Sequence, residues 1–158
     1  MKRMKASIVV SLAMAAAATV ALHAQADAHV GTWKMNAAKS KLAPDSTVKS
    51  QTRTYAMYGD GLKGTVASVN ADGSKTTTSY SAHFDGKDYP YSGNPLIDTI
   101  VLKKVDANSF EGTLKKSGKV VQTVTNVVSK DGKVMTVTAR GTTAKGQKFT
   151  SVTVLEKQ

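Results

Sequence analysis

Turn-forming residues recur along this chain at short intervals, and their spacing limits the fold more than any other feature of the sequence. From residue 58 onward a turn signal comes about every 10 to 14 residues. The signals are YGDG at 58–61, NADG at 70–73, DG at 85–86, DAN at 106–108, KSGK at 116–119, KDGK at 130–133 and AKG at 144–146. Asp-Gly pairs supply the left-handed backbone that tight hairpins require, so consecutive strands are expected to be antiparallel neighbours.

Ten segments between these turns have the Thr-rich and Val-rich composition of strands. They lie at 29–35, 47–57, 62–69, 74–84, 87–91, 97–105, 109–116, 119–129, 133–140 and 147–156. A meander of this many strands would expose two edges unless it closed on itself. The sequence therefore predicts an all-β fold, a single antiparallel up-and-down β-barrel of about 8 to 10 strands. Residues 36–46 fit either a loop or a turn of helix.

The first 26 residues have the pattern of an export signal. Lys2, Arg3 and Lys5 precede an unbroken small and apolar run at 6–22, and the run AQA at 24–26 supplies the small residues that signal peptidase reads. The apolar run is shorter than the roughly 20 residues that span a bilayer, so we expect cleavage rather than a stable membrane anchor. Removing residues 1–26 from the 158 leaves 132, residues 27–158, as one barrel domain. We expect a periplasmic or secreted bacterial protein.

Basic charge is spread over the sequence rather than clustered. Without its leader the chain keeps 19 of its 22 Lys and Arg residues and all 11 acids, a net charge of +8. Such a surface favours solubility and also allows a polyanionic partner. Basic residues do not alternate with aromatic ones on one strand face, so no nucleic-acid partner is expected. The chain has no Cys, which excludes disulfides and a lipid-modified cysteine.

The only tryptophan lies in the first predicted strand, in the run Gly31-Thr32-Trp33. Gly-x-Trp at the start of a ten-strand meander resembles the signature of the calycin superfamily, the lipocalins and fatty-acid-binding proteins. The run GTWKMNAAKSKL also resembles the start of secreted bacterial lipocalin-like proteins of unknown function. The resemblance implies a lipocalin-like barrel that binds a small, largely apolar ligand in or at its mouth. We expect a monomer without a cofactor and, because no catalytic group is identifiable, not an enzyme.

The same resemblance implies that Trp33 packs across the barrel floor under a cation that follows the last strand. Ten up-and-down strands bring the last strand back to the start of the first, which makes Lys157 the predicted partner rather than Arg140. Two family features have no counterpart in this sequence. The carboxylate-holding Arg-x-Tyr of fatty-acid-binding proteins would fall at Thr153 and Leu155, and residues 36–46 are too few for their two lid helices.

Connections from odd to even strands all lie at the end away from Trp33, and they include the three longest connections. We expect this rim to be the mouth, because long loops on barrels carry function. The candidate ligand-binding residues are Tyr80, Phe84, Tyr89, Tyr91, Arg140, Lys39 and Lys145. The two tyrosines on either side of Pro90 fit either a rigid aromatic lip or a cover over a sheet edge. The rim lysines fit either an anion site or ordinary surface solubility.

Ten side chains are expected to point inward. They are Trp33, Leu62, Val66, Tyr80, Phe84, Phe110, Leu114, Met135, Val137 and Phe149. They can line a cavity or fill a small barrel completely. No catalytic or metal-binding pattern is recognisable, since neither His29 nor His83 has a nucleophile partner. The alternative function is an envelope-associated module that uses its basic exterior to bind an anionic polymer or a protein partner.

Overall fold

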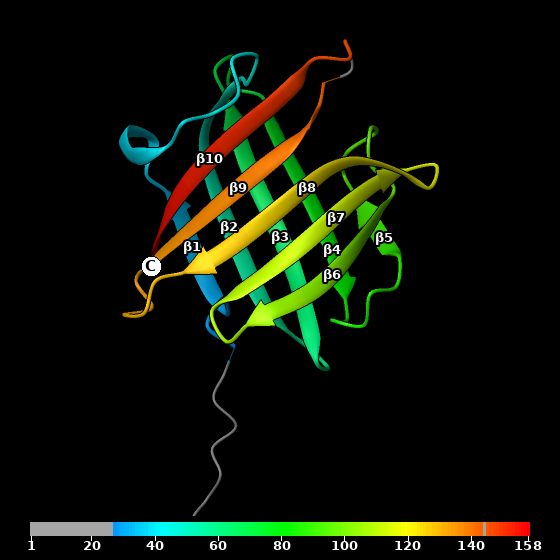
Figure 1. Ribbon diagram of the computed structural model, residues 1–158. Helices are drawn as coiled ribbons and strands as arrows, with labels where there is room; N and C mark the ends of the chain where they lie inside the picture. Colours follow the sequence, from blue (N-terminus) through cyan, green and yellow to red (C-terminus); the bar gives the residue numbers. More distant parts are fainter. Residues whose placement is uncertain (1–26, 144) are drawn as a thin grey trace, which may run out of the picture.

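A computed structural model describes residues 27–143 and 145–158 of the chain, and the predicted leader at 1–26 lies outside them (Figure 1). Over the described residues ten strands form a closed barrel in sequence order. The strands are β1 (Gly31–Met35), β2 (Val48–Tyr58), β3 (Gly61–Asn70), β4 (Lys75–Ala82), β5 (Tyr89–Ser92), β6 (Thr99–Asp106), β7 (Ser109–Lys116), β8 (Lys119–Val128), β9 (Val134–Thr142) and β10 (Lys148–Lys157). Every pair is antiparallel, and β1 pairs with β10 to close the sheet. The predicted up-and-down barrel is confirmed.

The turn chemistry of the sequence explains why the strands are joined as hairpins. In the β3–β4 turn Gly73 has a φ of 83°, a left-handed conformation that glycine adopts without a steric penalty. The carboxylate of Asp72 accepts a hydrogen bond of 2.9 Å from the backbone nitrogen of Ser74. The β8–β9 turn repeats this arrangement with Gly132, at a φ of 72°, and Asp131. Each turn reverses the chain so that the next strand lies beside the last.

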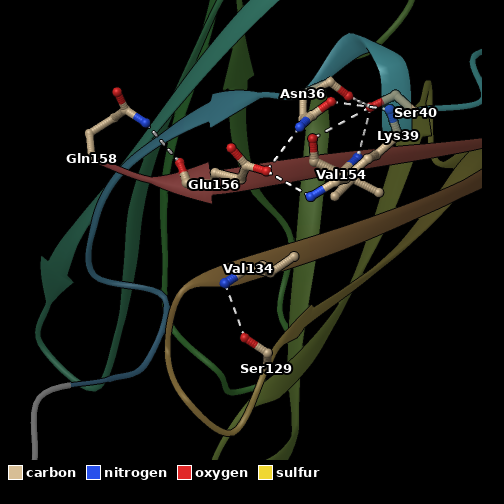
Figure 2. Close-up of polar contacts among 8 residues, drawn as sticks. All are labelled: Asn36, Lys39, Ser40, Ser129, Val134, Val154, Glu156 and Gln158. Atoms are coloured by element: carbon tan, nitrogen blue, oxygen red, sulfur yellow. Dashed lines mark hydrogen bonds and ion pairs between the residues drawn. The ribbon is translucent and has the colours of Figure 1, made fainter.

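The long β1–β2 connection is held against β10 (Figure 2). It begins with a short 3-10 helix, η1 (Ala37–Lys39), so the predicted loop or turn of helix contains both. The side chains of Asn36 and Lys39 donate to the same carboxylate oxygen of Glu156, at 2.9 and 3.1 Å. The hydrogen bond from Asn36, followed by that from Lys39, lowers the pKa of Glu156. These contacts fix the start of the β1–β2 connection to β10 near its closed end.

The barrel has two different ends. The β1–β2, β3–β4, β5–β6, β7–β8 and β9–β10 connections lie at one end, which we call the mouth. The other four connections lie at the opposite end, with both the Asp27–Val30 segment and the end of β10, and we call this the closed end. Seven of the ten side chains predicted to point inward belong to the buried core. Figure 1 shows β1 and β10 meeting at this end.

Strand β5 is the weakest part of the sheet. It pairs with β4 only at Ser79–Ser92 and Tyr80–Tyr91, and with β6 only at Tyr89–Ile100 and Pro90–Thr99. Proline has no backbone N–H, so Pro90 cannot donate to either neighbour. The wall between β4 and β6 is therefore held by fewer backbone hydrogen bonds than the rest of the barrel.

Candidate ligand-binding site

Trp33 and Lys157, the predicted floor pair, lie together at the closed end. The two residues are register partners on β1 and β10. Trp33 is fully buried, and its indole N–H donates to the backbone oxygen of His29 over 2.8 Å. The ammonium of Lys157 lies 5.1 Å from the centre of the Trp33 ring, within the range of a cation–π contact.

A polar network that the sequence did not predict surrounds this pair. The carboxylate of Asp27 accepts from the backbone of His29 at 2.9 Å, contacts its Nδ1 at 2.8 Å and forms an ion pair with Lys104. Burial raises the pKa of Asp27, but the hydrogen bonds from His29 and Lys104 outweigh it and hold the pKa well below its ordinary value. The imidazole of His29 is fully buried, 4.6 Å from the ring of Phe110. The segment before β1 thus closes the barrel.

Two predicted mouth residues lie at the closed end instead. Phe84 packs 5.9 Å from Phe110, with the Lys104 ammonium 5.1 Å from its ring centre. The hydroxyl of Tyr89 donates to Asp85 over 2.7 Å in the β4–β5 connection, and this bond raises the pKa of Tyr89 to about 12. Tyr89 and Tyr91 do not form a rim lip, because β5 covers 89–92 rather than the predicted 87–91 and Tyr89 lies opposite the buried Ile100. Tyr89 begins that strand at the closed end.

Sequence reasoning missed Arg53, which points into the barrel. Arg53 on β2 lies opposite Trp33 on β1, and residues directly opposite in an antiparallel pair face the same side of the sheet. Its Nε donates to the side-chain oxygen of Gln51 over 2.7 Å, and Gln51 donates to Ser68 over 3.1 Å. Among the described residues, no acidic side chain forms an ion pair with Arg53. The barrel therefore holds a guanidinium whose charge is not balanced by a carboxylate.

Three tyrosines from three strands lie around this arginine. Tyr80 and Tyr91 are stacked with ring centres 6.0 Å apart, and the Tyr91 hydroxyl donates to Thr78 over 2.9 Å. Tyr55 lies two residues beyond Arg53 and is also buried. Burial raises the pKa of both Tyr80 and Tyr91, while the charge of Arg53 acts in the opposite direction. Arg53 is thus within electrostatic range of both phenols. Tyr80 faces inward as expected, and Tyr91, its register partner on β5, faces the same side rather than the rim.

A cavity of about 460 Å³ opens at the mouth. Its apolar lining comes from Leu96 and Ile97 of the β5–β6 connection, Val121 of β8 and Phe149 of β10. Gly141 of β9 is required here, because a Cβ would lie 2.6 Å from the backbone oxygen of Val121 and 3.0 Å from the Phe149 ring. The rim that the loop pattern favoured therefore carries a cavity with an apolar wall.

The three predicted basic ligands do not line the interior. Arg140 alternates with Ala139 and Gly141, which face inward, so its side chain lies on the outer face beside Thr123 and Thr150. Arg140 lies toward the mouth end of β9, as the strand count predicts, but its side chain points outward and does not line the cavity. Lys39 is paired with Glu156 at 3.1 Å, and Lys145 is exposed in the β9–β10 turn.

The described residues contain no group of three or more His, Asp or Glu side chains placed to hold a metal ion. Within the same residues, no helix has the length and apolar character needed to cross a bilayer.

Comparison with known proteins identifies no family for the chain. No family model matches it, and no curated protein matches it. Among solved structures, zebrafish ileal bile acid-binding protein in complex with cholic acid is similar at 11% sequence identity. That similarity covers 83% of this chain and 99% of that one, with a TM-score of 0.49. Any ligand of this barrel must therefore be inferred from its own side chains.

Proposed function

We propose that this protein binds a small amphipathic ligand, with the largely apolar body inside the barrel and an anionic group at Arg53. The observation that carries the proposal is the inward guanidinium without a carboxylate partner among the described residues. A charge removed from water is costly unless an opposite charge and hydrogen bonds compensate it. A carboxylate, sulfonate or phosphate can accept two hydrogen bonds from one guanidinium and would supply that compensation.

The surroundings of Arg53 support an amphipathic ligand rather than a free anion. The nearby side chains are aromatic, and the stacked Tyr80 and Tyr91 rings offer apolar faces as well as hydroxyl groups. The mouth cavity, at about 460 Å³, has the size usual for small-molecule sites. We infer that the ligand enters at the mouth with its apolar part against Ile97 and Phe149.

Two dyes with the same aromatic body test the proposal. 1-Anilinonaphthalene-8-sulfonate carries a sulfonate, and N-phenyl-1-naphthylamine does not. The wild type is expected to bind both saturably, and the sulfonate more tightly. Arg53→Gln should weaken sulfonate binding about tenfold or more, because a charge-assisted hydrogen bond contributes about 1.5 to 3 kcal/mol. Arg140→Gln, which removes an exposed arginine from the outer wall, is the matched control and should change neither affinity.

The proposal fails if neither dye binds saturably and native mass spectrometry of protein from its own cells shows no adduct. Equal loss of sulfonate binding in the Arg53 and Arg140 variants would also contradict it, because binding would then depend on general surface charge. If the wild type bound the neutral dye more tightly than the sulfonate, Arg53 would not be the anion-binding group that we propose.

We further propose that the protein acts outside the cytoplasm as a monomeric binding protein, after cleavage before Asp27. The charged start and apolar run of residues 1–26 support export. N-terminal sequencing of protein from the periplasmic fraction tests this, with Asp27 as the expected first residue. A chain recovered with residue 1 intact from the cytoplasm would contradict it.

A second candidate function is attachment to an anionic envelope polymer. It is favoured by four cations at the mouth end of β8–β10 that form no ion pair among the described residues: Lys119, Arg140, Lys145 and Lys148. Retention on immobilised heparin should fall steeply between low and high salt if these charges bind it, because exposed charges are screened. Retention that does not depend on salt would count against this function.

A further inference from the structure

The outer wall of the barrel carries a groove of about 380 Å³ across β3, β4 and β5, which shares no lining residue with the mouth cavity. Short hydroxyl side chains form its floor. Ser79 lies opposite Ser92 on β5, and Ser81 lies opposite Lys63 on β3. These positions alternate with the inward-facing Tyr80 and Ala82, so they face out. The groove exists because small serines lie between larger flanking side chains.

Aromatic rings border this groove toward the closed end. Tyr58, which is 43% exposed, lies 4.9 Å from His83, and His83 lies 5.6 Å from Tyr89, measured between ring centres. The His83 Nδ1 contacts Asp60, and the Tyr89 hydroxyl donates to Asp85. Polar contacts thus hold His83 and Tyr89 in position. Tyr58 is exposed and packs on the His83 ring, whereas Tyr89 is partly buried against the core and reaches the groove from its edge.

The serine and lysine side chains of the groove make no hydrogen bonds or ion pairs with other described residues. Among the described residues, the hydroxyls of Ser79, Ser81 and Ser92 make no hydrogen bond within the protein. Lys63 forms no ion pair with a described acidic residue. By contrast, the hydroxyl of Tyr91 on the inner side of the same wall donates to Thr78. The groove thus presents free donors and acceptors beside fixed aromatic rings.

We infer that this outer groove binds a saccharide chain. A hexopyranose ring has C–H faces that pack on aromatic rings and hydroxyls that both donate and accept, which matches the tyrosine border and serine floor. A purely apolar ligand would cover the serine hydroxyls without satisfying them. A polyanion would meet one lysine, Lys63, but also the carboxylates of Asp60 and Asp85. The groove shares only Tyr80 with the Arg53 site, and the inference does not depend on Arg53.

An NMR titration of the ¹⁵N-labelled protein with chitohexaose tests the inference, with sorbitol as a hydroxyl-rich probe that lacks a ring. Chitohexaose should give saturable shifts centred on the amides of residues 63, 79, 81 and 92. Sorbitol should give none. Tyr58→Ala should weaken binding roughly fivefold to tenfold, because a stacked aromatic contact is lost. Met57→Ala, on the opposite face of the same strand and 50% exposed, is its matched control.

Ser81→Leu provides a second variant, because it fills the groove while the tyrosine border stays. It should abolish the shifts, whereas Ser50→Leu on the outer face of β2 should leave them unchanged. The inference is overturned if chitohexaose shifts nothing, shifts only residues outside β3–β5 or acts no differently from sorbitol. It is also overturned if Met57→Ala weakens binding as much as Tyr58→Ala. Dye binding at the mouth should be equal in all four variants, so a failure here is distinct from a failure of the Arg53 site.

Discussion

Lys104 near the closed end and Arg53 on β2 both lie on the inner side of the barrel wall, and their surroundings differ. Lys104 forms an ion pair with Asp27 and lies over the ring of Phe84. Arg53 donates to the neutral oxygen of Gln51 and has no carboxylate partner among the described residues. The first cation is compensated by the fold itself. The second is placed where only an added anion would compensate it.

This difference separates a structural region from a binding region. At the closed end the indole of Trp33, the carboxylate of Asp27 and the ammonium of Lys157 all contact groups of the same chain. Substitutions there should therefore change the free energy of unfolding whether or not a ligand is present. Substitution of Arg53 should instead change how far a ligand stabilises the protein.

The largest expected effect is that of Trp33→Ala. Removing a fully buried indole leaves a cavity at the closed end and should lower the free energy of unfolding by about 3 to 5 kcal/mol. Urea unfolding followed by far-ultraviolet circular dichroism measures this change. Val120→Ala, which shortens a side chain that is 59% exposed at the mouth, is the control and should cost less than about 0.5 kcal/mol. Equal losses in the two variants would contradict a floor role for Trp33.

In contrast to Trp33→Ala, Arg53→Met should not destabilise the ligand-free protein. Without ligand its stability should equal or exceed that of the wild type, because an uncompensated charge is replaced by an apolar side chain. With anilinonaphthalene sulfonate at 100 times its dissociation constant, the wild type should gain about 2.7 kcal/mol and the variant far less. Thermal unfolding with and without the dye measures both quantities. A large loss of stability in the ligand-free variant would mean that Arg53 supports the fold.

The fold could be predicted because its signals are local. Asp-Gly turns and alternation in strands such as 74–84 depend on neighbouring residues, and the strand count then determines that β10 returns to Trp33. The site could not be predicted in the same way. Alternation places Arg53 and Tyr55 on one face of a strand, but only the register between β1 and β2, across a long connection, shows that this face is the inner one.

The errors have the same physical origin. The prediction that Tyr89 lies at the mouth is wrong because strand boundaries are uncertain by a few residues. Strand β5 covers residues 89–92 rather than the predicted 87–91, so Tyr89 begins the strand at the closed end. The pairing of Asp27 with Lys104 joins residues 77 positions apart, and no local pattern indicates it. Arg140 was the one error that sequence alone could have avoided, since its neighbours Ala139 and Gly141 already suggested an outward side chain.

Asp27→Asn tests whether the Asp27 carboxylate, paired with Lys104, stabilises the fold, and the readout is how stability depends on pH. The pKa of Asp27 in the folded protein is below its ordinary value of 3.8, so the carboxylate stabilises the fold fully above about pH 4. That contribution is lost as the pH falls toward the folded pKa. The variant should be less stable than the wild type by about 1 to 2 kcal/mol at pH 7, and the two should converge on acidification. Urea midpoints measured from pH 7 to pH 2 show this.

Asp45→Asn is the matched control, because Asp45 is exposed at the mouth and makes no ion pair with a described residue. Its stability should follow that of the wild type at every pH. If the Asp27 and wild-type curves stay parallel on acidification, the carboxylate of Asp27 does not stabilise the closed end through its charge.

Lys157→Met measures the smallest of the expected effects on stability, that of the Lys157 ammonium over Trp33 at the closed end. Methionine keeps the apolar stem of the side chain but removes the ammonium that lies over Trp33, so only the cation–π contact and the charge are lost. The free energy of unfolding should fall by about 0.5 to 1 kcal/mol, since the contact is partly exposed. Lys133→Met is the control, because Lys133 is exposed beside the end of β10 and lies over no aromatic ring. If the two variants are equally stable, Trp33 holds the floor by packing and by its hydrogen bond to His29, and the cation above it is incidental.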